Sequence, residues 1–150
     1  MSVFRRQGKT TTSLTFLKKA SQAIDLNSVV SIDADGYIIP ATASTTNIKG
    51  IALEKISSTD SDYATARAIP IDIVKPGELF EMACNTALTQ TMVGMLYDLA
   101  DANTVDNSDD SGAIDVIEIV GIVKAAYASG NPSIALVRFN PTPEFSVTAA

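Results

Sequence analysis

The chain has 150 residues, a net charge of −6 and a hydrophobic fraction of 46%, which is enough for one domain with a sizeable core. It contains no His, the usual general base and commonest metal ligand, and its single cysteine, Cys84, excludes an intrachain disulfide. No apolar run reaches the ~20 residues that span a bilayer, and the start of the chain lacks the apolar segment of a signal peptide. These properties predict a protein that is made in a cytoplasm and stays soluble there, with no membrane partner.

The charge is distributed unevenly along the chain. Residues 1–24 carry +5 and no acidic side chain, whereas the remainder carries −11. A basic segment of this kind indicates an arm with an acidic partner, but an acidic body would repel DNA or RNA, so we expect no nucleic-acid partner. Residues 1–12 show neither a helical nor a strand period, and residues 13–24 fit an extended or a short helical form. The five basic residues of this segment are Arg5, Arg6, Lys9, Lys18 and Lys19.

The next part of the chain predicts strands separated by turns. Residues 28–32 are rich in Val and Ile, and residues 37–39 form a return strand after a turn at Gly36, which makes a hairpin. Residues 48–56 predict another strand, and residues 66–74 alternate in polarity. Because proline lacks an N–H donor, Pro70 predicts that this last strand lies at a sheet edge or is bulged there.

The second half of the chain continues the same pattern. Strands are predicted over residues 78–83, 93–99, 113–126 with a bend at Gly121, and 133–140. Residues 85–92 fit one helical turn capped by Asn85 or Thr86. Residues 100–112 read as an acidic loop. The fold class predicted is mainly β, a compact β-barrel or sandwich of short strands with an extended N-terminal arm.

A weak internal repeat accompanies these strands. Residues 48–55 (IKGIALEK) are echoed by residues 119–124 (IVGIVK), and the alternating residues 68–73 are echoed by residues 133–137. Gly50 and Gly121 stand at the same place in the two copies and read as bulges or points of close packing.

Candidate sites for chemistry each have a simpler structural explanation. The loop 106–112 (DNSDDSG) lacks the Gly and Glu that a calcium-binding EF-hand loop requires at its sixth and twelfth positions. Cys84 has no His to activate it and reads as a structural thiol. Asp33 and Asp35 adjoin Gly36 and read as turn residues. We therefore expect no catalytic residue, no cofactor and no metal.

Three motifs stand out between residues 29 and 140: residues 29–41 (VVSIDADGYIIPA), residues 49–53 (KGIAL) and residues 71–77 (IDIVKPG). Over these residues the sequence resembles the small capsid decoration, or head cement, proteins of tailed bacteriophages. Residues 93–99 (VGMLYDL) fit the second half of that family. The resemblance implies a non-enzymatic protein on the outer surface of the virion, synthesised in the host cytoplasm. It also implies a homotrimer that binds the major capsid protein and stabilises the shell by bridging capsid subunits.

These expectations divide the chain into a basic N-terminal arm (residues 1–20), a β-barrel decoration domain (residues 21–140) and a C-terminal tail (residues 141–150). We expect the arm to bind the capsid through its basic and apolar side chains. Two alternatives remain open, namely another virion structural subunit such as a tail or head-fibre component, and an enzyme or small-ligand-binding barrel. The expected capsid-binding residues are Arg5, Arg6, Lys9, Leu14, Phe16 and Leu17.

Overall fold

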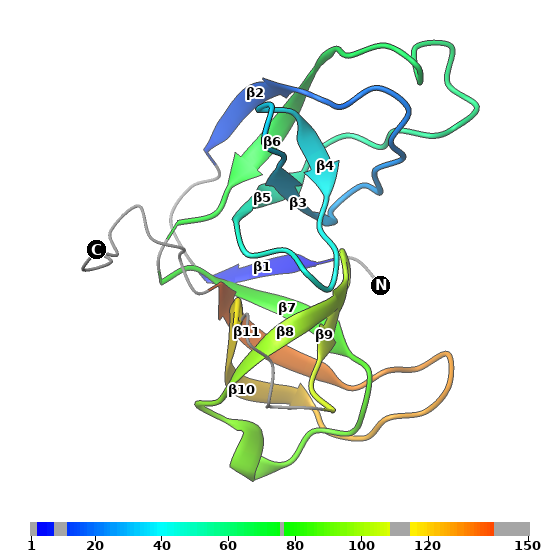
Figure 1. The fold of residues 1–150 in the computed structure, drawn as a ribbon. Helices are drawn as coiled ribbons and strands as arrows, with labels where there is room; N and C mark the ends of the chain where they lie inside the picture. The colour runs from blue at the N-terminus through cyan, green and yellow to red at the C-terminus, as the bar shows by residue number, and fades with distance from the viewer. Residues whose placement is uncertain (1–2, 8–11, 76, 109–114, 140–150) are drawn as a thin grey trace.

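The computed structural model describes residues 3–7, 12–75, 77–108 and 115–139, with only the backbone described for residues 4–7. These residues form eleven β-strands and one 3-10 turn, and none of them lies in an α-helix. The strands form two lobes stacked one above the other (Figure 1). The predicted mainly β fold, a compact arrangement of short strands, is therefore confirmed.

The upper lobe in Figure 1, which we call the first barrel, is built from five strands. In the sheet they follow the order β2-β6-β5-β3-β4. An isolated parallel bridge between Lys18 and Ile38 joins the end of β2 to β4 and closes the ring. The strands are β2 (Ser13–Leu17), β3 (Val29–Ile32), β4 (Ile38–Pro40), β5 (Ile48–Ala52) and β6 (Ala68–Ile73).

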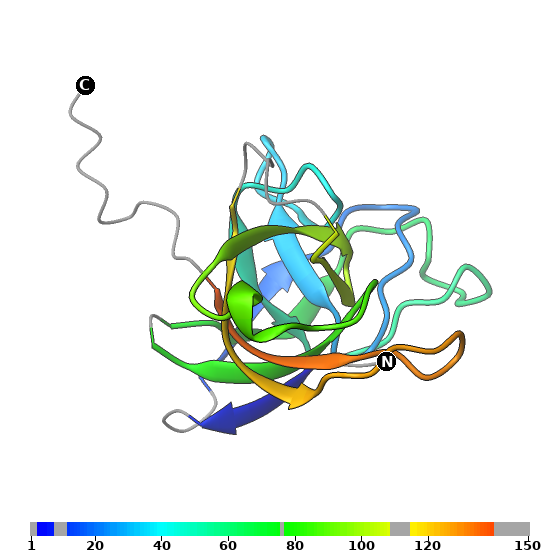
Figure 2. The same cartoon turned by 90° about the horizontal axis from the view of Figure 1, so that it is seen from below.

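The lower lobe, the second barrel, is closed more completely. Its strands follow the order β7-β11-β10-β8-β9, and a parallel pairing of β7 with β9 returns the sheet to its first strand, as the view from below shows (Figure 2). The strands are β7 (Leu79–Cys84), β8 (Leu96–Asp101), β9 (Thr104–Asp106), β10 (Ile117–Lys124) and β11 (Ile134–Phe139).

The two barrels have the same topology. Numbered within each barrel, both sheets have the order 1-5-4-2-3, with strand 3 pairing in parallel to strand 1. The echo in the sequence locates the correct strands, because β5 and β10 are both fourth strands and β6 and β11 are both fifth strands. The register differs, however. Ile71 and Val137 are equivalent residues of the two fifth strands, because they pair with Leu14 and Phe80 at corresponding places on the first strands. Ile71 also pairs with Ala52, two residues after Gly50, whereas Val137 also pairs with Ile119, two residues before Gly121. The two glycines are therefore not equivalent.

Each barrel has an apolar interior, and the interior of the second extends across the junction. Ile24, Val30, Ile38, Ala52, Ile56, Ile69 and Ile71 form the core of the first barrel. Three buried residues of the first barrel, Val29, Ala41 and Ile51, belong instead to the core cluster of the second. The Val29 amide also donates to the Ala102 carbonyl across the junction at 2.8 Å. The two barrels are therefore packed against each other through buried apolar side chains.

The segment expected to be a separate arm, residues 1–20, supplies strands to both lobes. Strand β1 (Phe4–Gln7) pairs with β7 of the second barrel, whereas β2 is the first strand of the first barrel. Val3, just before β1, is buried at the junction, and its amide donates to the Asn27 carbonyl at 3.0 Å. Residues 1–2 and 8–11 lie outside the described residues, as does the tail beyond Phe139.

Three local predictions turned out differently. Pro70 lies in β6, which has β2 on one side and β5 on the other, so the predicted edge strand is wrong. The proline is tolerated there because it lies just beyond the last paired residue of β5, Ala52, and its carbonyl still accepts from Leu53 N at 3.2 Å. The helical turn of residues 85–92 is reduced to Gln90–Met92, and the predicted caps Asn85 and Thr86 bond instead to Asp106 and Asn107. Strand β9 lies within the predicted acidic loop.

Candidate docking surface

One side of β2 is open in the described part of the chain. The Lys18 amide donates to Arg67 O, and Thr12 O accepts from Ile73 N, so the even-numbered residues make the hydrogen bonds to β6. Since hydrogen bonding alternates along an antiparallel pair, the N–H and C=O groups of Ser13, Thr15 and Leu17 point away from β6. We call the backbone of residues 13–17 on this side the β2 edge.

Exposed leucines lie along this strand. Leu14 is 51% exposed and Leu17 is 49% exposed, although both are large apolar residues. Phe16 is half-buried, packs against the first core, and has the Lys49 ammonium 5.1 Å from its ring centroid. A lysine over an aromatic ring adds about 0.5–1 kcal/mol at an exposed site. The strand β2 thus exposes apolar area on both faces, Leu14 on one and Leu17 on the other, with a positive charge nearby.

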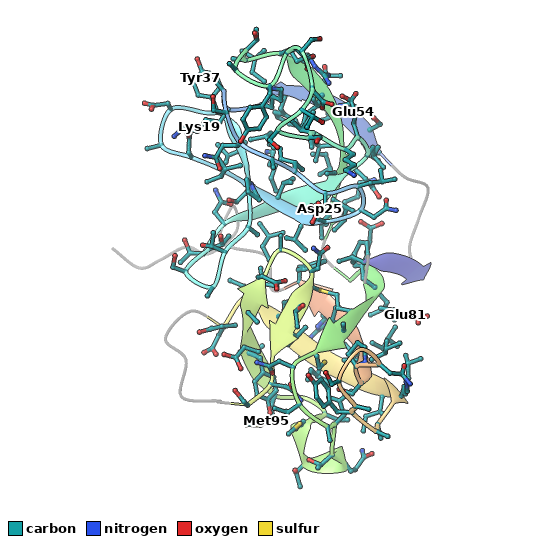
Figure 3. All side chains as sticks on the ribbon, turned by 90° about the vertical axis from the view of Figure 1, so that its right-hand side faces the viewer. Lys19, Asp25, Tyr37, Glu54, Glu81 and Met95 are labelled. Atoms are coloured by element: carbon teal, nitrogen blue, oxygen red, sulfur yellow. The ribbon has the colours of Figure 1, made fainter. Side chains whose placement is uncertain are left out.

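Two further lysines flank the same strand. The Lys75 ammonium donates to the Thr12 hydroxyl at its beginning. Lys19, just after its end, forms a salt bridge of 2.9 Å with Asp33. The hydrogen bond between them raises the pKa of Lys19 and lowers the pKa of Asp33, so both groups are charged at neutral pH. Figure 3 shows Lys19 beside Tyr37 at the outside of the first barrel.

The other expected capsid-binding residues lie elsewhere. Arg5 and Arg6 belong to β1, where Arg5 faces Phe80 of β7 in the strand register. Lys9 lies outside the described residues. The structure therefore brings Leu14, Phe16 and Leu17 together on β2, and it places the backbone of Arg5 and Arg6 on the other barrel.

Lys18 has a role that the sequence reasoning missed. Its side chain is fully buried and its ammonium donates to the carbonyls of Asp62, Tyr63 and Thr65. The distance from Lys18 Nζ to Thr65 O is 2.5 Å. These three carbonyls belong to the long loop before β6, which Lys18 fastens to the barrel. The signal was present in the sequence, since a period of two places Leu14, Phe16 and Lys18 on one face.

The polar residues considered for chemistry have structural roles. Asp33 accepts from the amides of Asp35 and Tyr37 and shapes the hairpin turn before Gly36, which has a φ of 88°. Cys84 is buried in the second core, and this burial raises the pKa of its thiol to about 12. Hydrogen bonds from Ser108 and Asn85 lower the pKa of Asp106.

The loop that follows Asp106 is only partly described. Asn107 is buried, accepts from Thr86 N and donates to the carbonyls of Thr86 and Ala87. It thereby joins the start of the loop to the segment after β7. Residues 109–114, which include most of the sequence considered for calcium, lie outside the described residues.

Within the described ranges no three His, Cys, Asp or Glu side chains gather in a way that could hold a metal ion. Over the same residues no helix is long and apolar enough to cross a membrane. Comparison of the chain with protein-family models, with curated proteins and with solved structures gave no match.

Proposed function

We propose that this protein is a structural capsid decoration protein that binds the outside of a phage head and bridges subunits of the major capsid protein. The observation that carries the proposal is the surface of β2, where Leu14 and Leu17 are half-exposed beside Lys19 and Lys49 in a chain that is acidic beyond residue 24. Such a surface suits a partner that offers apolar area and negative charge. The resemblance of the sequence motifs to phage head cement proteins supports the major capsid protein as that partner.

The energetic contribution of the leucines exceeds that of the charges. Exposed ion pairs contribute only ~0–1 kcal/mol each, whereas full burial of a leucine side chain contributes ~1.5–3 kcal/mol. Leu14 and Leu17 would therefore supply most of the binding, and the lysines would act mainly on the association rate. The proposed assembly is a homotrimer, in which three such surfaces engage the shell together.

Binding to purified phage heads that lack the protein tests this proposal. Full-length protein is mixed with the heads, and bound copies are counted after sedimentation. Leu17→Asp should reduce binding at least tenfold, because it places a carboxylate in the apolar contact. Val123→Asp is the matched control, since Val123 is 47% exposed on β10 of the second barrel and should leave binding within twofold of the native protein.

Other outcomes would contradict the proposal. Absence of binding by the native protein to any head preparation would reject the capsid role, and equal losses in both variants would place attachment elsewhere. Trimer formation is measured separately, by analytical ultracentrifugation of the free protein and by symmetry averaging of decorated heads. Single isolated copies on the heads together with a monomer in solution would reject the trimer.

A further inference from the structure

The shared topology makes β2 and β7 equivalent, since each is the first strand of its barrel. In the first barrel Leu14 faces Ile71 and Phe16 faces Ile69 of the fifth strand. In the second, Phe80 faces Val137 and Met82 faces Ala135 of the fifth strand. The inward positions of the two first strands therefore correspond, and Leu14 is the counterpart of Phe80. This correspondence allows the outer sides of the two strands to be compared residue by residue.

The outer side of β7 is covered along its length. Its third-strand neighbour β9 pairs with Ala83 and Cys84, and β1 pairs antiparallel with the preceding residues, Leu79 to Glu81. On β2 the third-strand neighbour β4 reaches only Lys18. In the residues that the structure describes, no strand takes the place beside Ser13–Leu17 that β1 takes beside β7.

The exposure of the side chains shows the same difference between the two strands. Phe80 is 1% exposed, whereas its counterpart Leu14 is 51% exposed. Val3, next to β1, is buried and belongs to the core cluster that contains Phe80. As far as the described residues go, the first barrel is therefore open at the point where β1 and Val3 cover the second.

We propose that the β2 edge accepts an extended segment of a partner protein, which adds antiparallel to β2 as β1 adds to β7. The incoming backbone would satisfy the outward groups of Ser13 and Thr15 and the outward N–H of Leu17, and an apolar side chain would cover Leu14. The edge has features that favour such pairing: residues 13–17 contain no proline, no charged side chain and no bulge in their register with β6. The proposed function enters only in the identity of the partner, which would be the major capsid protein.

The charged side chains near β2 determine which kind of partner segment can pair with it. Lys75 contacts Thr12 just before β2, Lys49 lies over the ring of Phe16 within it, and Lys19 follows its last residue by two positions. The occupied edge shows the reverse arrangement, because β1 carries Arg5 and Arg6 and pairs with a strand that contains Glu81. The partner segment for β2 is therefore acidic, with apolar residues at alternate positions. A second copy of this chain fits poorly, because its own β1 would bring two arginines to a lysine-rich edge.

Two labelled hexapeptides test the proposal with the full-length protein. One alternates valine with glutamate and the other alternates valine with lysine, and binding of each is followed by fluorescence anisotropy. We expect the glutamate peptide to bind at least tenfold more tightly than the lysine peptide. Thr15→Pro should weaken the glutamate peptide at least tenfold, because it removes an outward N–H without removing a hydrogen bond to β6. Thr15→Ala keeps that N–H and should change the affinity less than twofold.

A second variant, at another residue of β2, controls for loss of binding that results from misfolding of Thr15→Pro. Leu14→Asp changes a half-exposed side chain and should also weaken the glutamate peptide at least tenfold, while thermal unfolding reports on the fold of each variant. Equal affinity for the two peptides, no binding of the glutamate peptide, or full binding by folded Thr15→Pro protein would overturn the proposal. Self-association that Thr15→Pro abolishes would overturn it as well, by showing that the occupant is a second copy.

Capsid binding is scored independently of peptide binding. Heads that take up the protein while hydrogen exchange at Ser13, Thr15 and Leu17 stays unchanged would support the capsid role and reject the edge. Peptide binding by a protein that no head preparation takes up would support the edge and reject the capsid role.

Discussion

Lys18 and Cys84 occupy equivalent positions in the two barrels, each on the inner face of the first strand where the third strand joins it. Cys84 pairs with Val105 of β9, and Lys18 pairs with Ile38 of β4, both in parallel. In the second barrel the position is filled by a small apolar thiol within the core. In the first it holds an ammonium that reaches three loop carbonyls. The same topology therefore supports a closed apolar interior in one copy and an anchored loop in the other.

Replacing Lys18 should destabilise the protein. Lys18→Met removes the donor from the carbonyls of Asp62, Tyr63 and Thr65 and should lower the free energy of unfolding by about 1–3 kcal/mol. Lys19→Met is the control, because Lys19 makes only a surface ion pair with Asp33, which solvent screens, so its loss should cost much less than the loss of Lys18. Urea unfolding measures both variants. Equal effects would show that the buried lysine does not hold the loop.

Cys84 should be unreactive in the folded protein. Burial raises the pKa of its thiol from 9.0 to about 12, so the thiolate that reacts with disulfide reagents is scarce near pH 8. We expect labelling in urea to be at least tenfold faster than in buffer. Labelling at equal rates in the two conditions would show that the second core opens readily.

The same pKa shift predicts a loss of stability in alkali. The unfolded thiol releases its proton near pH 9 while the folded thiol keeps it, so its contribution is complete below pH 9 and is lost as the pH rises towards 12. This contribution falls by at most ~1.4 kcal/mol per pH unit. Cys84→Ala should show a flatter dependence of stability on pH across that window, measured by urea unfolding at each pH.

Gly50 and Gly121 should differ sharply when each is replaced by alanine. A Cβ at Gly50 would lie 2.3 Å from the Asp72 carbonyl oxygen and 2.7 Å from Ile71 Cγ2, whereas a Cβ at Gly121 meets nothing closer than 3.8 Å. Gly50→Ala should therefore lower the free energy of unfolding by about 1–3 kcal/mol or more, because β5 must move away from β6. Gly121→Ala should change it by less than ~1 kcal/mol. Similar losses would show that the two strands are not packed as described.

Phe80 and Leu14 provide the corresponding test of the two first strands. Phe80→Ala should lower the free energy of unfolding by ~3–5 kcal/mol, because the ring of Phe80 is buried and its centroid lies 5.2 Å from that of the Phe139 ring. Leu14→Ala should cost less than ~1 kcal/mol, because half of the leucine is already exposed to solvent. A large loss in Leu14→Ala would mean that something within the chain covers β2.

The sequence predicted the strands well where they are long or joined by a tight turn. The hairpin of β3 and β4 around Gly36, the bulge near Gly121 and the close approach at Gly50 all follow from local residue chemistry. Strand β9 could not be predicted, because its three residues are ordered by pairing with β7 and β8 rather than by their own propensity. The prediction that Pro70 lies in an edge strand failed for a related reason. Whether residue 70 needs an N–H donor depends on where the neighbouring strand β5 ends, which the sequence of β6 does not show.

The docking surface could be predicted only in part. Leu14, Phe16 and Leu17 stand out in the sequence as apolar residues beside basic ones, and the structure places them on one strand. Their setting could not be inferred, because the open side of β2 becomes apparent only by comparison with β7 in the other barrel. The role of Lys18 likewise depends on a loop more than 40 residues further along the chain.

The crossing of β1 to the second barrel has a consequence for biosynthesis. β1 leaves the ribosome before its partner β7, which begins at Leu79, so at 5–20 residues per second the strand waits roughly 4–15 s for a neighbour. The first barrel can close within that time, because its last strand ends at Ile73. A nascent chain halted between these two points would carry residues 4–7 without their partner strand, and trypsin should cleave there more readily than in the finished protein. The second barrel therefore includes a strand that is made before all of its other strands.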